Sequence, residues 1–232
     1  MNDLGFLAQL HIHTSESSAC GAAPAAAMMR ACKDAGYSLV VITDHFMNAN
    51  TVTNRRDPWA KQVRDLMRGY NNAKDEGDKI GLTVLFGWET FNDGPEYLTY
   101  GLGEDFLLAN PDIAALRAVD YLIRIEQAGG FVCHAHPYRQ ADYIPPFVPM
   151  HEHLEAFEVY NGNNKPEYNP PALAEARRHN MIELAGCDAH NIDAVAAGAM
   201  RLPHPVHDME GLIAAIRSRQ CEIIERLPMS VY

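Results

Sequence analysis

The sequence predicts an α/β fold in which parallel strands close into a distorted barrel. Apolar, partly β-branched runs alternate with amphipathic or alanine-rich segments about seven times along the chain, a pattern typical of a parallel sheet covered by helices. Polar residues of the metal-ligand type follow nearly every predicted strand. In a closed barrel these strand ends meet at one mouth, whereas an open sheet would spread them along an edge, so we favour the barrel.

The predicted strands are short apolar runs. Residues 38–43 show the pattern most clearly, because a continuous β-branched run is typical of a strand that is buried on both faces. The other strands are expected at residues 6–10, 82–86, 96–101, 130–133, 156–160, 181–185, 199–202 and 222–224.

The predicted helices lie between these runs. Residues 24–36 form the clearest one, with Pro24 near the start, alanines in the middle and Gly36 at the end. No repeat, low-complexity segment or linker interrupts the chain, so we expect a single domain over residues 1–232. The other helices are expected at residues 58–76, 111–127, 171–179 and 208–217, and loops at residues 46–57 and 138–150.

Composition excludes several classes of function. The chain has 232 residues, of which 47% are hydrophobic, enough for a substantial core. A net charge of −11 without a Lys/Arg-rich run argues against nucleic acid as a primary partner. No run is long enough to cross a bilayer, and no signal peptide is visible, so we expect no membrane partner. Five scattered cysteines indicate a reducing cytoplasm, and nothing indicates the oligomeric state.

Two histidines follow the first predicted strand. His11 and His13 stand two residues apart, directly after residues 6–10. Because residues i and i+2 of a strand point to the same face, the two imidazoles are expected side by side. Two neutral imidazoles held in this way make up half of a typical metal site. Taken alone, such a pair is more often structural, with one ring exposed and the other buried.

Four further strand ends carry residues of the same kind. His45, Glu89, His136, and the pair Asp188 and His190 each follow a predicted strand. Taken singly, each fits a helix cap, a turn or a solvated surface residue. Their repetition at the ends of successive strands favours a metal centre. Imidazole and carboxylate ligands suit Zn, Mn or Fe(II), and a carboxylate such as Glu89 can bridge two ions.

The ordered motifs of the chain resemble those of the polymerase and histidinol phosphatase (PHP) superfamily. The resemblance extends from residue 6 to about residue 202. It implies a distorted (β/α)7 barrel of the TIM-like type, with two or three divalent metal ions (Mn, Fe or Zn) at its mouth, and hydrolysis of phosphate esters. The motifs are His11-x-His13-Thr14, Thr43-Asp44-His45, Gly87-x-Glu89, Ala135-His136-Pro137 and Gly186-x-Asp188-x-His190.

The resemblance also implies which residues hold each ion. The first ion is expected between His11, His13, Glu89 and Asp188. The second is expected between Glu89 and His136, and the third between His45 and His190.

The chain departs from the family pattern in two places. Many members carry an Asp or His shortly after the first motif, whereas residues 17–21 offer no expected ligand, which leaves Glu16 or a water to complete the third site. Where the family has a His on the strand after Gly-x-Glu, this chain has Glu96. A carboxylate there would favour Mn or Fe(II) over Zn. His134 is a rival ligand for that ion, or else a core or supporting histidine.

Several further residues are candidates for contact with a substrate. Arg139 follows His136 closely and would clamp a phosphate, unless it is a solvated surface residue. Asn161 and Lys165 follow another strand, where an Asn/Gly turn is the alternative. Arg201, near a late strand, is a weaker candidate. His151, His153, His204 and His207 are expected on the surface.

These features predict a metal-dependent phosphoesterase that hydrolyses a small phosphomonoester. A metal-activated hydroxide would attack phosphorus, and Arg139 would offset charge on the phosphoryl oxygens. His45 or His190, where not fully used as ligands, would protonate the leaving group. Two alternatives stay open: a metallohydrolase of another bond, such as an amide or a phosphotriester, and a module of the same fold with reduced or no catalysis.

Overall fold

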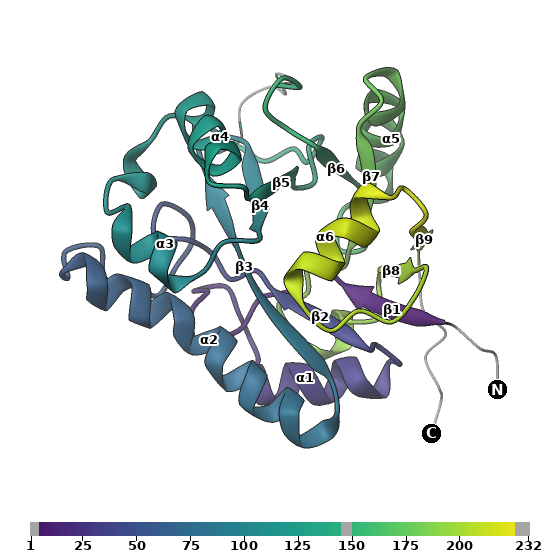
Figure 1. Ribbon diagram of the computed structural model, residues 1–232, viewed down its shortest axis with the longest axis horizontal. Helices are drawn as coiled ribbons and strands as arrows, with labels where there is room; N and C mark the ends of the chain where they lie inside the picture. The colour runs from purple at the N-terminus through teal and green to yellow at the C-terminus, as the bar shows by residue number, and fades with distance from the viewer. Residues whose placement is uncertain (1–4, 145–149, 226–232) are drawn as a thin grey trace.

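The computed structural model describes residues 5–144 and 150–225, and its strands form one mixed sheet that curls into a nearly closed barrel (Figure 1). The predicted barrel is therefore confirmed. Along the sheet the strands follow the order β7-β6-β5-β4-β3-β2-β1-β8-β9. Their bounds are β1 Phe6–Gln9, β2 Leu39–Ile42, β3 Thr83–Phe91, β4 Glu96–Tyr100, β5 Phe131–His134, β6 Ala156–Asn161, β7 Ile182–Gly186, β8 Ala199–Leu202 and β9 Glu222–Ile224.

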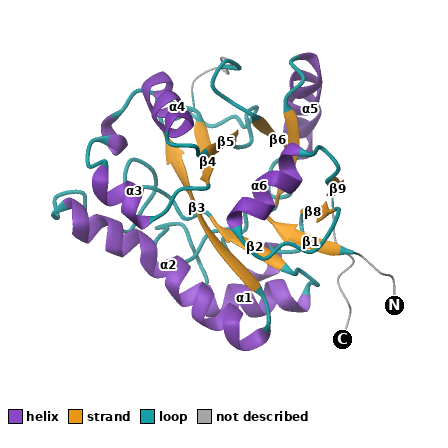
Figure 2. Ribbon diagram, in the orientation of Figure 1, coloured by secondary structure: helices purple, strands orange, loops and turns teal. Residues whose placement is uncertain are grey.

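The helices lie mainly around the outside of the strands (Figure 2). The predicted helix over residues 111–127 is wrong in its first half, because Leu116 and Arg117 are extended and α4 begins only after them. The bounds are α1 Ala25–Asp34, α2 Trp59–Ile80, α3 Glu104–Ala109, α4 Ala118–Gln127, α5 Asn169–Arg178 and α6 Met209–Arg217, with short 3₁₀ turns at Ile113–Ala115, Pro166–Tyr168 and Ile192–Ala194. None of the helices in the described residues combines the length and apolarity needed to cross a membrane.

The prediction that all strands run parallel is wrong for two of them, β4 and β8. β4 is antiparallel to both β3 and β5, and β8 is antiparallel to both β1 and β9. The connection from β3 to β4 spans only residues 92–95, too short for the crossover that parallel strands need. This reversal has a consequence for the site. The first residue of β4, Glu96, pairs with Phe91 and so lies at the same end of the barrel as Glu89.

The barrel closes at its mouth. Ile12, just beyond β1, forms a parallel bridge with Ala189, just beyond β7. The Asp188 amide donates to the His11 carbonyl at 2.8 Å, and the His13 amide donates to the Ala189 carbonyl at 3.0 Å. Lower down, β8 pairs with the first half of β1 instead. The first and last ligand-bearing segments are therefore joined through their backbones.

The barrel interior is apolar below the mouth. Alternate residues of the strands, such as Ala8, Leu39 and Val41, point into one core cluster, which α6 completes with Leu212 and Ile216. The intervening residues of the same strands pack outward against the helices. Helix α6 thus crosses the end of the barrel opposite the mouth and fills the interior there (Figure 1). The polar groups inside the barrel are therefore found at its mouth.

Helix α2 approaches the mouth through a glycine. A Cβ atom added to Gly69 would lie 2.1 Å from Asp44 Oδ2 and 2.3 Å from Thr14 Oγ1. These two atoms are themselves joined by a hydrogen bond of 2.7 Å, in which the Thr14 hydroxyl donates to the buried Asp44 carboxylate. The helix backbone therefore packs directly on the hydrogen bond that joins the first two motifs.

We predict that Gly69→Ala destabilises the protein. In an exposed helix this change would stabilise by roughly 1 kcal/mol, but here the methyl group would displace Asp44, at an expected cost on the order of 1–3 kcal/mol. Urea unfolding measures the difference. Asn71→Ala, at an exposed position of the same helix, is the matched control and should be neutral or slightly stabilising. Equal stability of Gly69→Ala and the wild type would contradict the close packing.

Candidate metal centre

Imidazole and carboxylate side chains gather at the mouth of the barrel. Each of them belongs to at least one set of three residues whose ligand atoms lie within 4.8 Å of one another. All but one of these side chains are buried, and His190 is partly exposed. The members are His11, His13, His45, Glu89, Glu96, His136, Asp188 and His190.

The first group has the spacing of ligands around a single ion. His11 Nε2 lies 3.1 Å from His13 Nε2 and 3.3 Å from both Glu89 Oε1 and Asp188 Oδ1. His13 Nε2 lies 3.1 Å from Asp188 Oδ1 and 3.5 Å from Glu89 Oε2. Tetrahedral bonds of about 2.0–2.1 Å would place ligand atoms roughly 3.3 Å apart. These four residues are the set that the sequence predicted for the first ion.

A second group adjoins the first through Glu89. His136 Nε2 lies 3.2 Å from Glu89 Oε1 and 3.6 Å from Glu96 Oε2. Within the described residues, the buried Glu96 Oε2 has no hydrogen-bond partner. Burial, and then the charge of Glu89, raise the pKa of Glu96. A buried carboxylate oxygen without a donor beside two other ligand atoms fits a cation, and Glu96 therefore belongs to this group.

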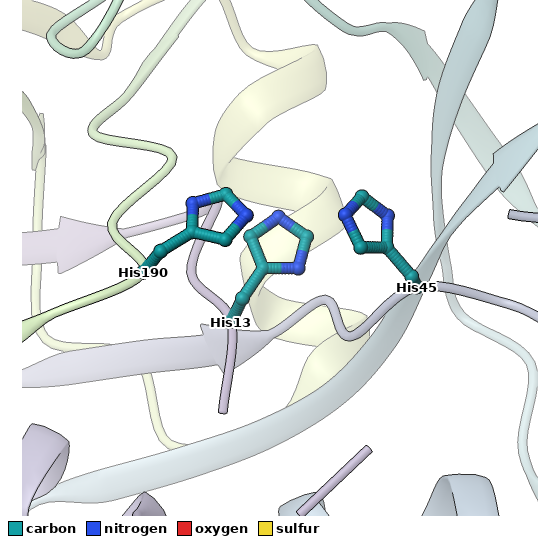
Figure 3. A group of neighbouring side chains, drawn as sticks. All are labelled: His13, His45 and His190. Carbon is teal, nitrogen blue, oxygen red and sulfur yellow. The ribbon is translucent and has the colours of Figure 1, made fainter. Parts of the chain in front are cut away.

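Three imidazoles make up a third group. His13, His45 and His190 stand in a row with His13 in the middle (Figure 3). The centroid of the His13 ring lies 4.4 Å from that of His45 and 4.3 Å from that of His190. The side chain of His190 is 27% exposed, so this end of the centre faces solvent.

Hydrogen bonds to Nδ1 orient several of these rings. His11 Nδ1 lies 2.9 Å from a Glu158 carboxylate oxygen, and His190 Nδ1 lies 2.9 Å from the Asp188 carbonyl oxygen. His13 Nδ1 lies 3.2 Å from the Ser18 hydroxyl, which itself donates to Asp44. A proton held on Nδ1 leaves Nε2 free as a ligand. The polar residues behind the rings thus set the tautomer that a metal ion requires.

Glu158 is a functional residue that sequence reasoning missed. It lies in the middle of β6 and is 1% exposed. Besides His11, it accepts hydrogen bonds of 2.9 Å from the His136 backbone amide and from Asn161 Nδ2. A Cβ atom at Gly186 would lie 2.6 Å from the same carboxylate, so this glycine makes room for it. A charged residue inside the apolar run of residues 156–160 was the signal available in the sequence.

Two of the candidate ligands have an unusual backbone. His136 has φ = 29° and Asp188 has φ = 49°, in the left-handed region that residues other than glycine rarely adopt. Each stands two residues after the last residue of a strand, β5 or β7, and the turn directs its side chain toward the other ligands. Such strain persists only where the surrounding structure imposes it, and it is concentrated at functional sites.

The cluster lowers the pKa of two of its carboxylates, Asp188 and Glu89. Burial alone would raise the pKa of Asp188 and of Glu89, but His11 and the other neighbouring cations and imidazoles hold both values well below the usual range. Burial lowers the pKa of His13 well below its ordinary value, and His45 adds to this effect. Buried carboxylates beside a neutral imidazole are the donor set of a divalent metal ion.

Two of the predicted substrate-binding residues lie beside the cluster. Arg139 donates from Nη2 to Asp188 and from Nε to Asn164 Oδ1 at 2.9 Å, and its side chain remains 23% exposed. Asn161 is buried and donates to Glu158, with a longer contact of 3.5 Å to Asp188. Arg139 therefore lies at the rim of the cluster, whereas Asn161 supports the ligands from behind.

The structure does not bring the other two to the cluster. Lys165 is exposed, and its Nζ lies 5.9 Å from the centre of the Tyr168 ring. The prediction for Arg201 is wrong. Because β8 runs antiparallel to β1, Arg201 lies opposite Leu7, at the end of the barrel away from the mouth, where it pairs with Glu222 at 2.6 Å.

His134 also lies outside the cluster. It is the last residue of β5, and its ring packs against Tyr97 and Phe157, with centroid distances of 5.2 and 5.6 Å. The predicted alternation with His136 fails because β5 ends at His134 and the backbone turns at His136. Of the two alternatives, the geometry favours a core histidine. Burial, and then the nearby His136, lower the pKa of His134 to about 3.

We predict that His134 makes the protein less stable in acid. In the unfolded chain His134 has an ordinary pKa of about 6.5 and binds a proton below that pH, whereas in the folded chain it stays neutral down to about pH 3. The free energy of unfolding therefore decreases as the pH falls toward 3. At about pH 5 this contribution is roughly 2 kcal/mol. His134→Phe should reduce the loss of stability between about pH 7.5 and pH 5 by that amount in urea unfolding. An unchanged loss would contradict the buried, neutral imidazole.

Cys20 is a second residue that sequence reasoning missed. The segment of residues 17–21 was expected to offer no ligand, yet the thiol of the exposed Cys20 lies near His190 and His45. Burial opposes ionisation, but these two imidazoles lower the pKa of the thiol to about 6. A thiol therefore lies near the third group, in the segment that was expected to offer no ligand. The signal available in the sequence was the position of Cys20 between Ser18 and Gly21, which form a turn in the structure.

One segment of the chain matches a known family. Residues 166–221 match the family described as PHP-associated. They include β7, which leads directly into Asp188 and His190. The comparison with curated proteins finds no match.

Three solved structures share the fold. A two-domain protein from Bacteroides vulgatus, described as containing a predicted PHP-like metal-dependent phosphoesterase, aligns with a TM-score of 0.69 and 16% identity over 95% of this chain and 65% of that one. PsfC from Pseudomonas syringae aligns with a TM-score of 0.67 and 18% identity over 94% and 91% of the two chains. A candidate metal-dependent phosphoesterase from Bifidobacterium adolescentis aligns with a TM-score of 0.55 and 17% identity over 91% and 96%.

This chain thus spans just under two thirds of the Bacteroides protein. It shares the barrel fold of these structures, and its residues 166–221 match the PHP-associated family.

Proposed function

We propose that this chain is a metal-dependent phosphoesterase that hydrolyses a small phosphomonoester. The observation that carries the proposal is the first group of ligand atoms, in which His11 Nε2 and His13 Nε2 lie 3.1 Å apart and each lies 3.1–3.5 Å from Glu89 and from Asp188. The descriptions of the Bacteroides and Bifidobacterium proteins support the same class of reaction.

The residues present fit more than one divalent ion. Glu89 has Oε1 toward His11 and His136, and Oε2 toward His13 and His45, with separations of 3.0–3.5 Å. One carboxylate therefore faces the first, second and third groups. Nitrogen and oxygen donors suit Zn, Mn or Fe(II), and the added carboxylate of Glu96 makes the second group favour Mn or Fe(II).

The chain's own residues orient the substrate. Bound divalent ions supply Lewis acidity and lower the pKa of bound water. The Arg139 guanidinium, at the rim of the cluster and tied to Asn164, can donate to phosphoryl oxygens and offset their charge. A phosphomonoester carries its negative charge on one compact group, which suits a single arginine. With a net charge of −11, the chain repels a long polyanion.

His45 and His190 are the candidates to protonate the leaving group. His190 is the more exposed, with 27% of its side chain accessible against 9% for His45. A nitrogen that is bound to an ion has no proton to donate, so this role and the role of third-site ligand exclude each other for the same nitrogen. Whether a metal ion occupies the third group decides which of these two roles the histidine nitrogens have.

We predict that Asp188→Asn abolishes hydrolysis of an aryl phosphate. Asp188 contacts His11, His13 and Arg139, so loss of its charge removes both a ligand and the partner of the arginine. With protein reconstituted in Mn²⁺, Fe²⁺ or Zn²⁺, kcat/KM should fall on the order of 100-fold or more. Asp193→Asn, at an exposed position nearby, is the matched control and should retain full activity.

The same assay separates the alternatives. If Asp188→Asn hydrolyses the aryl phosphate as fast as the wild type, the proposed centre is wrong. If the wild type cleaves only an amide or a phosphotriester in a substrate panel, it is a metallohydrolase of another bond. Fewer than two ions per chain after reconstitution, without any hydrolysis, would identify a module of this fold that lacks catalysis.

We further predict that Cys20 is a ligand in the third group. In the Co²⁺-loaded protein, a thiolate ligand adds a sulfur-to-cobalt charge-transfer band to the absorption spectrum. Cys20→Ser should remove that band, because serine keeps the size but not the thiolate. Cys221→Ser, at a partly exposed cysteine remote from the mouth, should leave it unchanged. A spectrum without the band in the wild type would show that Cys20 is not a ligand.

A further inference from the structure

A second cluster of ligand-type side chains lies outside the mouth of the barrel. Glu175 and His179 stand on one face of α5 and its C-terminal end, four residues apart. His151 reaches them from the chain that leads into β6. Their ion pairs join these three residues to one another and to Arg178, and none of these ion pairs reaches the metal centre.

The two imidazoles converge on a single oxygen atom. His151 Nε2 lies 3.4 Å, and His179 Nε2 lies 3.2 Å, from Oε1 of Glu175. The two rings are stacked, with centroids 3.6 Å apart and an angle of 11° between their planes. Zinc bonds of about 2.0–2.1 Å in a tetrahedral arrangement place neighbouring ligand atoms roughly 3.3 Å apart. The separations from Oε1 thus match those of the first group at the mouth, whereas the rings are closer than those of His11 and His13, whose centroids lie 5.1 Å apart, so one ring must turn to bind the same ion.

Hydrogen bonding does not account for this arrangement. His151 Nε2 is a buried atom, and within the described residues it has no hydrogen-bond partner of adequate geometry. The Glu175 carboxylate is 8% exposed, and its other oxygen, Oε2, lies 3.5 Å from Arg178 Nη1. Oε1 is therefore left facing two imidazole nitrogens, while the arginine occupies the opposite side of the carboxylate.

We propose that His151, Glu175 and His179 bind one Zn²⁺ ion. Two imidazoles and a carboxylate are a ligand set typical of zinc, and a water would take the fourth position. The 34% exposure of the His179 side chain leaves that position open to solvent. The ion would join the chain just before β6 to α5, which follows β6. It does not depend on the proposed function of the mouth.

Zinc counting tests this site. Metal-free protein is dialysed to equilibrium against micromolar Zn²⁺, and the bound zinc per chain is measured by mass spectrometry. The wild type should bind one ion more than His179→Ala, and His151→Ala should show the same loss. His153→Ala is the matched control, because His153 pairs instead with the exposed Glu126, and it should bind as much zinc as the wild type.

Two variants on separate elements keep the test decisive. Both histidines are partly exposed, and circular dichroism shows whether each variant is folded. Equal zinc content in the wild type and both folded variants would overturn the proposal. Should either variant not fold, the imidazole nitrogen resonances of the wild type provide the answer. In the wild type, zinc must shift the Nε2 resonances of two histidines, and these shifts must be missing in the variant that does fold. A wild-type spectrum without these shifts would overturn the site.

Discussion

The backbone hydrogen bonds between the end of β1 and the end of β7 are the constraint on which the metal centre depends. They join His11 and His13 to Asp188 and Ala189 at 2.8–3.0 Å. These residues are about 180 positions apart in the chain, and a barrel that failed to close here would separate the first ligands from the last. Because the bonded residues are themselves ligands or their direct neighbours, closure of the fold and assembly of the site are the same event.

Burial of charge is the second constraint. Glu89, Glu96, Glu158 and Asp188 are all buried at one end of a barrel whose remaining interior is apolar. Ionised carboxylates in such surroundings are costly unless cations or donors compensate them. Glu158 obtains donors from the protein, whereas Glu96 keeps an oxygen without one in the described residues. This difference separates a carboxylate that supports the ligands from one that is available to an ion.

Much of the site could be predicted from sequence because each ligand directly follows, or lies at the end of, a recognisable apolar run. The spacing of His11 and His13, and the turns after the strands at His136 and Asp188, are local features. The errors have non-local causes. Glu158 was missed because its partners come from the segments that follow β1 and β5, and Cys20 because the imidazoles near it are distant in sequence. Arg201 was misplaced because its strand reverses direction.

The sequence by itself determined the alternation of strands and helices, the main candidate ligands and their order along the chain, since all of these follow from residue periodicity and from what stands at each strand end. Only the tertiary structure decided which way β4 and β8 run, and therefore that Glu96 reaches the mouth and Arg201 does not. It also decided that His151 meets α5. Strand direction and contacts between distant segments depend on how the whole chain packs, and no local pattern encodes them.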